Sequence, residues 1–192
     1  MRFNVSTIAA CLAVLATQAP VHASSYLIDP NHTFVTFEIG HYKTSTNRGR
    51  FDKKQGSVEF DRFAKTGKIE MVIDTESIST GTPAFDRLLQ SASVFDTTNH
   101  PTAKFVSNQL TFQDGKVSDV SGMLTLLGKT KPVVLKAINF NCYASPVLKR
   151  EVCGGDFEAH LDRTEFGMDY GTTWGAPKDV RLSIQVEAIK QE

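Results

Sequence analysis

The segment Gly128–Thr130 reads Gly-Lys-Thr and is the part of this chain that most resembles a chemical motif. With Gly122 before it, the segment imitates a phosphate-binding loop, in which backbone N–H groups surround phosphate oxygens and a helix follows. That motif requires four residues between its two glycines, and here there are five. These five residues have the pattern of a strand, and Pro132 followed by Val133 and Val134 predicts a second strand. We therefore expect a hairpin and no nucleotide site.

The histidines do not have the spacing of a metal site or a catalytic centre. If His32 and His41 share one strand, their odd offset directs them to opposite faces, so they would not share an ion. His100 precedes a proline, and His160 alternates with apolar residues, which indicates solvated or rim positions. The chain has no Gly-x-Ser-x-Gly motif, and no pair of carboxylates lies in a context typical of a glycosidase. We expect no enzyme and no metal; an enzyme with an unconventional site is the alternative.

The first 23 residues have the organisation of a secretory signal. Arg2 precedes an apolar run over residues 8–16, and Val21-His22-Ala23 fits a small-residue cleavage site. Cleavage after Ala23 would leave residues 24–192 as one domain, and no later run approaches the roughly 20 apolar residues of a spanning helix. A lipoprotein modified at Cys11 is the alternative, but most of the apolar run follows that cysteine.

Two further cysteines, Cys142 and Cys153, belong to the part of the chain that would leave the reducing cytosol. Turn-forming and charged residues separate them, and strand-like runs flank them. We therefore expect a disulfide at the base of a hairpin loop, with a stabilisation of about 3 kcal/mol from loop closure. Two thiols without a third cysteine or a nearby histidine are a poor zinc site.

Charge and composition exclude several classes of function. The chain has 21 Lys and Arg against 21 Asp and Glu, and no basic tract that could neutralise several phosphates, so we expect no nucleic-acid partner. No repeat or Pro/Gly-rich linker divides residues 24–192. The sequence leaves a homodimer open.

Alternation of apolar and polar residues with period two dominates the chain and predicts half-buried strands. The clearest run is 181–188, which is apolar at every even position. Similar runs include residues 35–39, 58–60, 69–73, 105, 120–126 and 157–161, and others start near Arg48 and Lys131. We expect an all-β fold, an eight-stranded antiparallel barrel, with an open sandwich as the alternative.

One short helix interrupts the strands. It is predicted to begin after Thr82 as N-cap, with Pro83 in the first turn and Phe85, Leu88 and Leu89 on one face. A helix inserted between strands of a small barrel would form a lid or a plug over one end.

Several local sequences, in their order, resemble the YceI-like family of polyisoprenoid-binding periplasmic proteins, which have a lipocalin-like barrel. They are Asp29–His32 leading into Val35–His41, Arg48–Phe51, Asp74 with Ile78–Gly81, Leu89–Asp96, His100-Pro101 before Lys104-Phe105, Gly122–Val133 and Asp162–Met168. The resemblance covers nearly all of residues 24–192. Val94-Phe95 differs from the two phenylalanines usual in the family, and the loop between the cysteines occurs only in some members.

The resemblance implies a periplasmic carrier without catalysis or required cofactor, which holds a long amphiphile such as a polyprenyl lipid, a ubiquinone or a fatty amide. The expected apolar lining is Phe37, Ile39, Phe51, Ile73, Phe85, Leu88, Leu89, Phe95, Phe105, Leu124, Leu126, Phe166, Met168 and Trp174. For the head group we expect Arg163 and His41, and also Asn47. A structural ion pair is the alternative for Arg163. A carrier would contact the membrane surface transiently; a packed barrel that acts through a protein partner is the alternative function.

Overall fold

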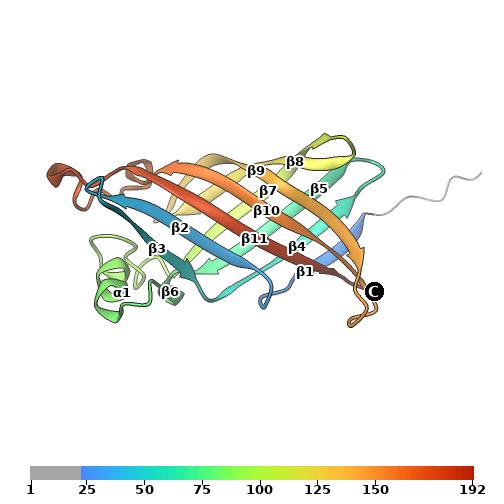
Figure 1. Cartoon of the computed structure of the whole chain (residues 1–192), viewed down its shortest axis with the longest axis horizontal. Coiled ribbons are helices and arrows are strands. Elements are labelled where there is room, and N and C mark those ends of the chain that lie inside the picture. Colours follow the sequence, from blue (N-terminus) through green and yellow to red (C-terminus); the bar gives the residue numbers. More distant parts are fainter. Residues whose placement is uncertain (1–22) are drawn as a thin grey trace, which may run out of the picture.

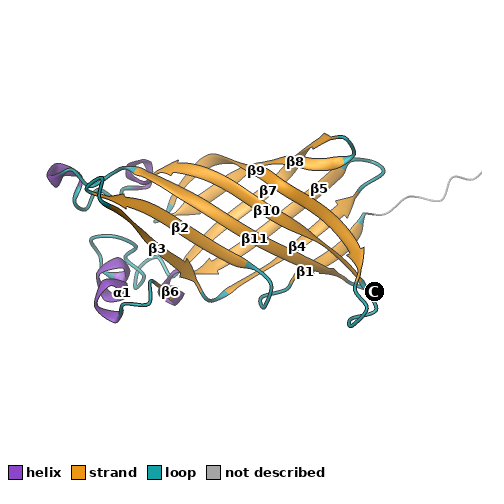
Figure 2. Cartoon of the chain, in the orientation of Figure 1, coloured by secondary structure: helices purple, strands orange, loops and turns teal. Residues whose placement is uncertain are grey.

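The structure is a computed structural model that describes residues 23–192. The predicted signal segment, residues 1–23, lies outside this part of the chain except for Ala23. Strands form most of the fold, and one short helix lies at one end (Figures 1 and 2). In chain order the elements are β1 (Ser24–Ile28), β2 (Phe34–His41), β3 (Ser45–Phe51), β4 (Lys54–Asp61), β5 (Thr66–Asp74), the 3-10 turn η1 (Thr75–Ser77), β6 (Ile78–Ser79), α1 (Pro83–Gln90), β7 (Thr102–Gln113), β8 (Lys116–Leu126), β9 (Lys129–Ala144), β10 (Glu151–Asp162), η2 (Arg163–Phe166), η3 (Thr172–Trp174) and β11 (Asp179–Lys190).

The sheet closes into an antiparallel barrel of eight strands, as predicted. The order β1-β4-β5-β7-β8-β9-β10-β11 returns to its start because β1 also pairs with β11. At the other end of the barrel, β2 pairs with β11, and β3 pairs with β2. β1 and β2 are thus two halves of one interrupted strand, and β3 and β4 are two halves of its neighbour. Closure of the eight strands excludes the open sandwich.

A bend between β1 and β2 interrupts the first strand at Asp29–Thr33. Asp29 is buried; its carboxylate accepts a hydrogen bond from the Asn31 N–H at 2.9 Å and lies 2.7 Å from His32 Nδ1. The Thr33 hydroxyl donates to the Glu187 carbonyl oxygen at 3.3 Å and accepts from the Glu187 N–H at 3.2 Å. The threonine side chain therefore replaces a missing rung of the ladder with β11. His32 lies in this bend and not on a strand with His41, which corrects the predicted arrangement.

The pairing of Asp29 with His32 predicts a pH-dependent contribution to stability. The hydrogen bond to Asp29 raises the pKa of His32 above 6.5, and the same bond lowers the pKa of Asp29 below 3.8. The histidine contribution is complete below pH 6.5 and is lost as pH rises through its folded-state value; the aspartate contribution is complete above pH 3.8 and is lost as pH falls. His32→Ala should therefore destabilise the protein most between about pH 4 and 6.5, which urea denaturation at a series of pH values would measure.

The control is the same substitution in an Asp29→Asn background. There the histidine lacks its hydrogen-bonded carboxylate and keeps only the weaker attraction of Glu187, so the extra cost of its removal in this pH window should become much smaller. A loss of stability that is equal at all pH values in both backgrounds would contradict the assignment.

The false phosphate-binding motif is a hairpin, as its spacing predicts. Leu126 pairs with Lys129, and Leu127 and Gly128 between them have φ of 50° and 71°. Two successive residues with positive φ are typical of a type I′ turn, which matches the twist of the flanking strands. Gly122 has a packing role, because the Phe105 ring occupies the position of a Cβ at this residue.

Helix α1 has the predicted start but not the predicted cap. Thr82 occupies the N-cap position and its carbonyl oxygen accepts from the N–H groups of Phe85 and Asp86, yet its side chain makes no capping hydrogen bond. The Asp86 carboxylate instead accepts from the N–H and the hydroxyl of Thr80, at 2.7 and 2.6 Å. These bonds bind the helix to the loop that precedes it.

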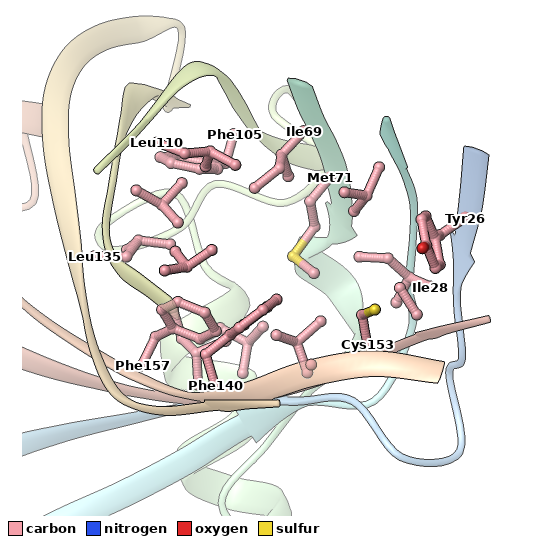
Figure 3. A pocket seen from close by; sticks show the side chains of 18 of the residues that line it. Tyr26, Ile28, Ile69, Met71, Phe105, Leu110, Leu135, Phe140, Cys153 and Phe157 are labelled. Atoms are coloured by element: carbon pink, nitrogen blue, oxygen red, sulfur yellow. The ribbon is translucent and has the colours of Figure 1, made fainter. Parts of the chain in front are cut away.

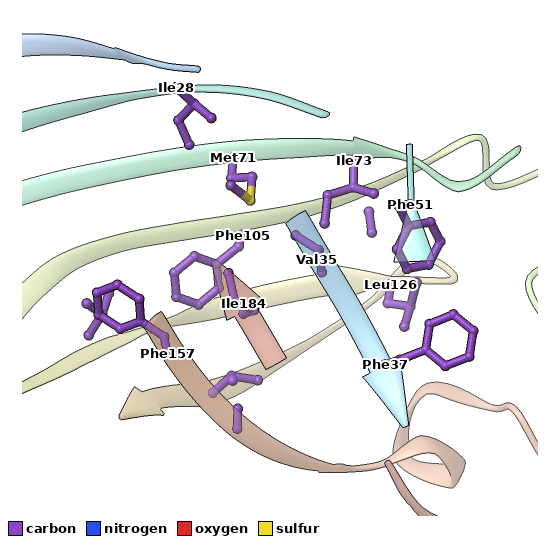
Figure 4. Close-up of a cluster of buried hydrophobic side chains, with 14 of the residues drawn as sticks. Ile28, Val35, Phe37, Phe51, Met71, Ile73, Phe105, Leu126, Phe157 and Ile184 are labelled. Atoms are coloured by element: carbon purple, nitrogen blue, oxygen red, sulfur yellow. The ribbon is translucent and has the colours of Figure 1, made fainter. Parts of the chain in front are cut away.

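The alternating apolar residues of the strands face the barrel interior. Even positions of β11 from Leu182 to Ala188 and odd positions of β2 from Val35 to Ile39 line the interior, as the sequence pattern predicts. Figure 4 shows side chains from β2, β5, β7, β10 and β11 directed toward one another in the interior of the barrel. The core therefore lies within the barrel and forms the wall of any cavity there.

The disulfide between Cys142 and Cys153 is present, with an S–S distance of 2.09 Å. The two cysteines are register partners on β9 and β10, at the base of the loop over residues 145–150. This is the position predicted from the sequence. Cys153 is buried and faces the barrel interior (Figure 3).

Candidate functional site

The barrel interior contains two adjoining cavities, here called the outer and inner chambers. The outer chamber has a volume of about 360 Å³ and the inner chamber about 130 Å³. Figure 1 shows α1 at one end of the barrel. The residues that line the outer chamber come from this end and from the loop over residues 167–178, and those of the inner chamber extend toward the opposite end. The outer volume is within the range of about 300–1,000 Å³ that is usual for small-molecule sites.

The outer chamber brings together nearly all of the predicted site residues. Its wall includes Phe37, Ile39, His41, Asn47, Phe51, Ile73, Phe85, Leu88, Leu89, Phe95, Leu124, Leu126, Arg163, Phe166, Met168 and Trp174. Phe105, the remaining predicted residue, lines the inner chamber. These positions agree with the predicted faces of the strands and of α1. Contact of these residues with a ligand stays a prediction.

Phenylalanines from different elements form one side of the outer chamber. The rings of Phe37 and Phe51 lie 6.0 Å apart, and Phe51 meets Phe95 edge-on at 5.6 Å. Phe95 follows α1 in the chain, so these contacts attach the helical segment to β2 and β3. The side of α1 with Phe85, Leu88 and Leu89 completes this wall.

The inner chamber is apolar, and an aromatic cluster lies at the end away from α1. Phe60 stacks on Phe112 at 6.3 Å and meets Phe140 edge-on at 5.7 Å. Cys153 and Tyr26 also line the chamber (Figure 3). The sequence identified the disulfide but did not predict this second chamber, although alternation in the runs at 58–60 and 182–188 marks its wall.

A polar cluster lies behind the apolar wall at the end of the barrel away from α1. The Tyr26 hydroxyl donates to the Glu151 carboxylate at 2.6 Å, and Arg62 pairs with the same carboxylate. Burial, followed by the bond to Glu151, raises the pKa of Tyr26 to about 12. Because this hydroxyl already has a partner, it offers no free polar group to a ligand in the inner chamber.

Arg163 borders the outer chamber, but its guanidinium has a structural role that differs from both sequence alternatives. It donates to the carbonyl oxygens of Pro177, Met168 and Tyr170 at 2.9, 2.6 and 2.8 Å. Arg163 is 7% exposed, and burial lowers the pKa of its guanidinium below the usual arginine range. Within residues 23–192 it makes no ion pair, so the predicted structural ion pair is wrong. Three of its five N–H groups hold the loop at the chamber mouth, which leaves little of the guanidinium for the predicted head-group contact.

His41 and Asn47 are the predicted polar residues whose side chains remain available at the mouth. Both line the outer chamber; His41 is exposed and Asn47 is half-buried. In the part of the chain that the structure describes, the Asn47 amide makes no hydrogen bond within the protein. Polar groups for a ligand are thus available at the outer end of the cavity.

Exposed aromatic side chains surround the mouth of the outer chamber. Tyr42 is 54% exposed, Tyr170 41% and Trp174 65%, and Trp174 meets Tyr170 edge-on at 5.7 Å. Tyr42 lies in the turn after β2, and the other two lie in the loop that Arg163 holds. Of these three residues only Trp174 was predicted to lie at the mouth, because exposure of a tyrosine at a rim depends on how loops from distant segments meet.

The described residues contain no group of three or more His, Cys, Asp or Glu side chains arranged to hold a metal ion. None of the helices in residues 23–192 has the length and apolar character that crossing a membrane requires. His160 is on the outer surface, where it pairs with Asp179 at 3.0 Å.

The sequence pattern of one known family, described as the YceI-like domain, matches residues 26–188. A "UPF0312 protein" of Pseudomonas aeruginosa is 33% identical over 184 residues, which cover 93% of this chain and 94% of that protein. "Protein YceI" of Shigella flexneri is 33% identical over 175 residues, with coverage of 88% and 89%.

Solved structures have the same fold. A YceI protein of Campylobacter jejuni superposes with a TM-score of 0.69 at 24% identity, over 80% of this chain and 91% of that one. A polyisoprenoid binding domain from Saccharophagus degradans superposes with a TM-score of 0.61 at 14% identity, over 88% of this chain and 100% of that one.

Proposed function

Because this chain belongs to the YceI-like family, we propose that it is a periplasmic carrier that holds one long isoprenoid lipid, a polyprenyl lipid or a ubiquinone, inside its barrel. The observation that carries the proposal is the pair of adjoining apolar chambers, which reach the surface at the α1 end. The related domain from Saccharophagus degradans, which is described as polyisoprenoid binding, supports the class of ligand.

The distribution of polar groups supports one orientation of the ligand. The inner chamber has an apolar wall, whereas His41 and Asn47 lie at the mouth of the outer chamber. A polar head buried without a hydrogen-bond partner would cost several kcal/mol, so the head stays at the mouth and the tail extends inward. A packed barrel that acts only through a protein partner would have a filled interior, and the chambers do not favour that alternative.

The energetics favour exchange with a membrane over tight sequestration. Transfer of a tail from water would gain about 0.8 kcal/mol per buried CH₂ group, which for a long tail exceeds any observed affinity, so water is not the relevant reference. The competing environment is a bilayer, which is as apolar as the chambers. Transfer of the tail is therefore nearly neutral, and the fit of the cavity and the contacts of the head determine selectivity.

The proposal includes transient contact between the mouth and a membrane surface. Tyr42, Tyr170 and Trp174 are the residue types that favour the boundary between lipid and water, and they surround the chamber mouth. Contact at this end would let a tail pass between bilayer and chamber without crossing water. The predicted signal peptide and the disulfide support a periplasmic location.

Trp174 is the only tryptophan in the chain and provides a spectroscopic reporter of loading. Since its indole is 65% exposed at the mouth, its fluorescence emission should shift to shorter wavelength when the protein is titrated with vesicles that contain ubiquinone. The control moves the reporter to the exposed loop between β9 and β10, at the end away from α1, with Val147→Trp in a Trp174→Phe background. The fluorescence emission of this variant should not shift. An unchanged Trp174 spectrum during a titration that loads the barrel would place the indole outside the ligand's path.

Native mass spectrometry after incubation with phosphatidylcholine vesicles tests the carrier function. Vesicles that contain ubiquinone or a polyprenol should yield a complex with one isoprenoid per chain. Vesicles of phosphatidylcholine alone are the matched control for uptake of ordinary lipid. A protein that stays at its polypeptide mass with both isoprenoids would refute the proposal.

A further inference from the structure

The two chambers meet at a zone that we call the waist, formed by the side chains that line both of them. These are Val35 of β2, Ile73 of β5, Leu124 of β8 and Leu182 of β11. Figure 4 shows Val35 and Ile73 directed into the same interior space. The four strands that carry these residues lie at different positions around the barrel wall. The waist therefore borders the path from the mouth to the inner chamber on several sides.

The waist separates two spaces of different size and chemistry. On the mouth side, the chamber of about 360 Å³ includes His41 and Asn47. Beyond the waist, the chamber of about 130 Å³ has apolar walls and ends at the cluster of Phe60, Phe112 and Phe140. A tail that enters from the mouth meets the waist first, and the aromatic cluster limits how far it can extend.

We infer that the waist and the inner chamber select the ligand by the length of its isoprenoid tail. This inference rests on the proposed carrier function. A short tail ends in the outer chamber and leaves the inner chamber empty. The apolar side chains that line the inner chamber then have no van der Waals contact with the ligand. A long tail passes the waist and fills both chambers. The inner chamber thus makes the barrel prefer long tails over short ones.

The side chains at the waist differ in how freely they can be changed. Val35 is 4% exposed and Ile73 9%, so larger side chains there would strain the wall. Leu124 and Leu182 are only partly buried and border open cavity, so a phenylalanine at either position can extend into the passage. Val186 lines the inner chamber and not the outer one. A larger side chain at this position would fill the inner chamber without a change at the waist.

The test measures loading from phosphatidylcholine vesicles that contain ubiquinones of two, four, eight or ten isoprene units, with native mass spectrometry as the readout. The expected result is that Leu182→Phe lowers the ratio of long-tail to short-tail loading by about tenfold relative to the unmodified protein. Val186→Phe should lower the same ratio, because it removes the space beyond the waist. Leu124→Phe is a second waist variant if Leu182→Phe does not fold.

The matched control is Val134→Phe, which adds the same side chain at a 49% exposed position on the outer face of β9 and should leave the length preference unchanged. The inference fails if the waist and inner-chamber variants retain the length preference of the unmodified protein, or if they lose all tail lengths equally. Neither of these two results would contradict the proposed carrier function. If the unmodified protein loads no ubiquinone of any length, the proposed function itself is refuted, and the inference with it.

Discussion

Replacement of Arg163 by lysine should open the loop at the chamber mouth while the barrel stays folded. The guanidinium donates to three backbone carbonyl oxygens of residues 168–177, and a lysine ammonium cannot reach three acceptors in the same planar arrangement. Loss of these charge-assisted bonds from a buried site should lower the free energy that keeps the loop closed by about 3 kcal/mol. Hydrogen exchange at the amides of residues 167–177 should then accelerate by about 100-fold.

The control for this experiment is Lys178→Ala, which removes an exposed cation from the same loop but retains the backbone hydrogen bond from the Arg163 N–H to the residue 178 carbonyl. Its exchange should equal that of the unmodified protein. Since the loop carries Tyr170 and Trp174, the Arg163→Lys variant should also release a bound isoprenoid to vesicles faster. Equal exchange in this loop for Arg163→Lys and the unmodified protein would contradict the structural role of the guanidinium.

Among the substitutions proposed for this protein, removal of the disulfide should cause the largest loss in the free energy of global unfolding. The bond between Cys142 and Cys153 closes a loop at the end of β9 and β10, and its loss should lower the free energy of unfolding by about 3 kcal/mol. For a domain of this size the expected decrease in Tm is about 10 °C. Urea denaturation and calorimetry of a Cys142→Ala/Cys153→Ala protein would measure both quantities.

A thiol reductant provides an internal control for the disulfide prediction. The unmodified protein should lose about the same stability when reduced, whereas the double alanine variant should not respond to the reductant. If the unmodified protein is equally stable with and without reductant under conditions in which its thiols become free, the bond does not stabilise the fold in the way proposed.

The sequence predicted those features of the fold that depend on local pattern. Alternation over residues 181–188 predicted a half-buried strand with its even positions on one face, because side chains along a strand point to opposite faces in turn. The structure adds that this face of β11 lines the cavity. The five-residue spacing before Gly128 predicted the hairpin, and the structure adds the two positive φ values of its turn. The disulfide followed from the spacing and context of the cysteines.

Features that depend on the meeting of distant segments could not be predicted in the same way. Arg163 was expected to contact a head group, and no sequence pattern indicates that the carbonyl oxygens of residues 168–177 surround its guanidinium. The division of the interior into two chambers depends on how side chains from four strands, Val35, Ile73, Leu124 and Leu182, meet inside a closed barrel. Thr82 occupies the predicted N-cap position, but its side chain makes no capping hydrogen bond, and Asp86 instead accepts hydrogen bonds from Thr80.

The most direct test of the central claim is mass spectrometry of the protein isolated without detergent from the organism that makes it. The intact native mass is compared with the species recovered in an organic extract. The carrier function predicts one isoprenoid lipid or quinone per chain, with the added mass in the native spectrum equal to that of the extracted species. A protein of bare polypeptide mass that also takes up no added isoprenoid would contradict the account.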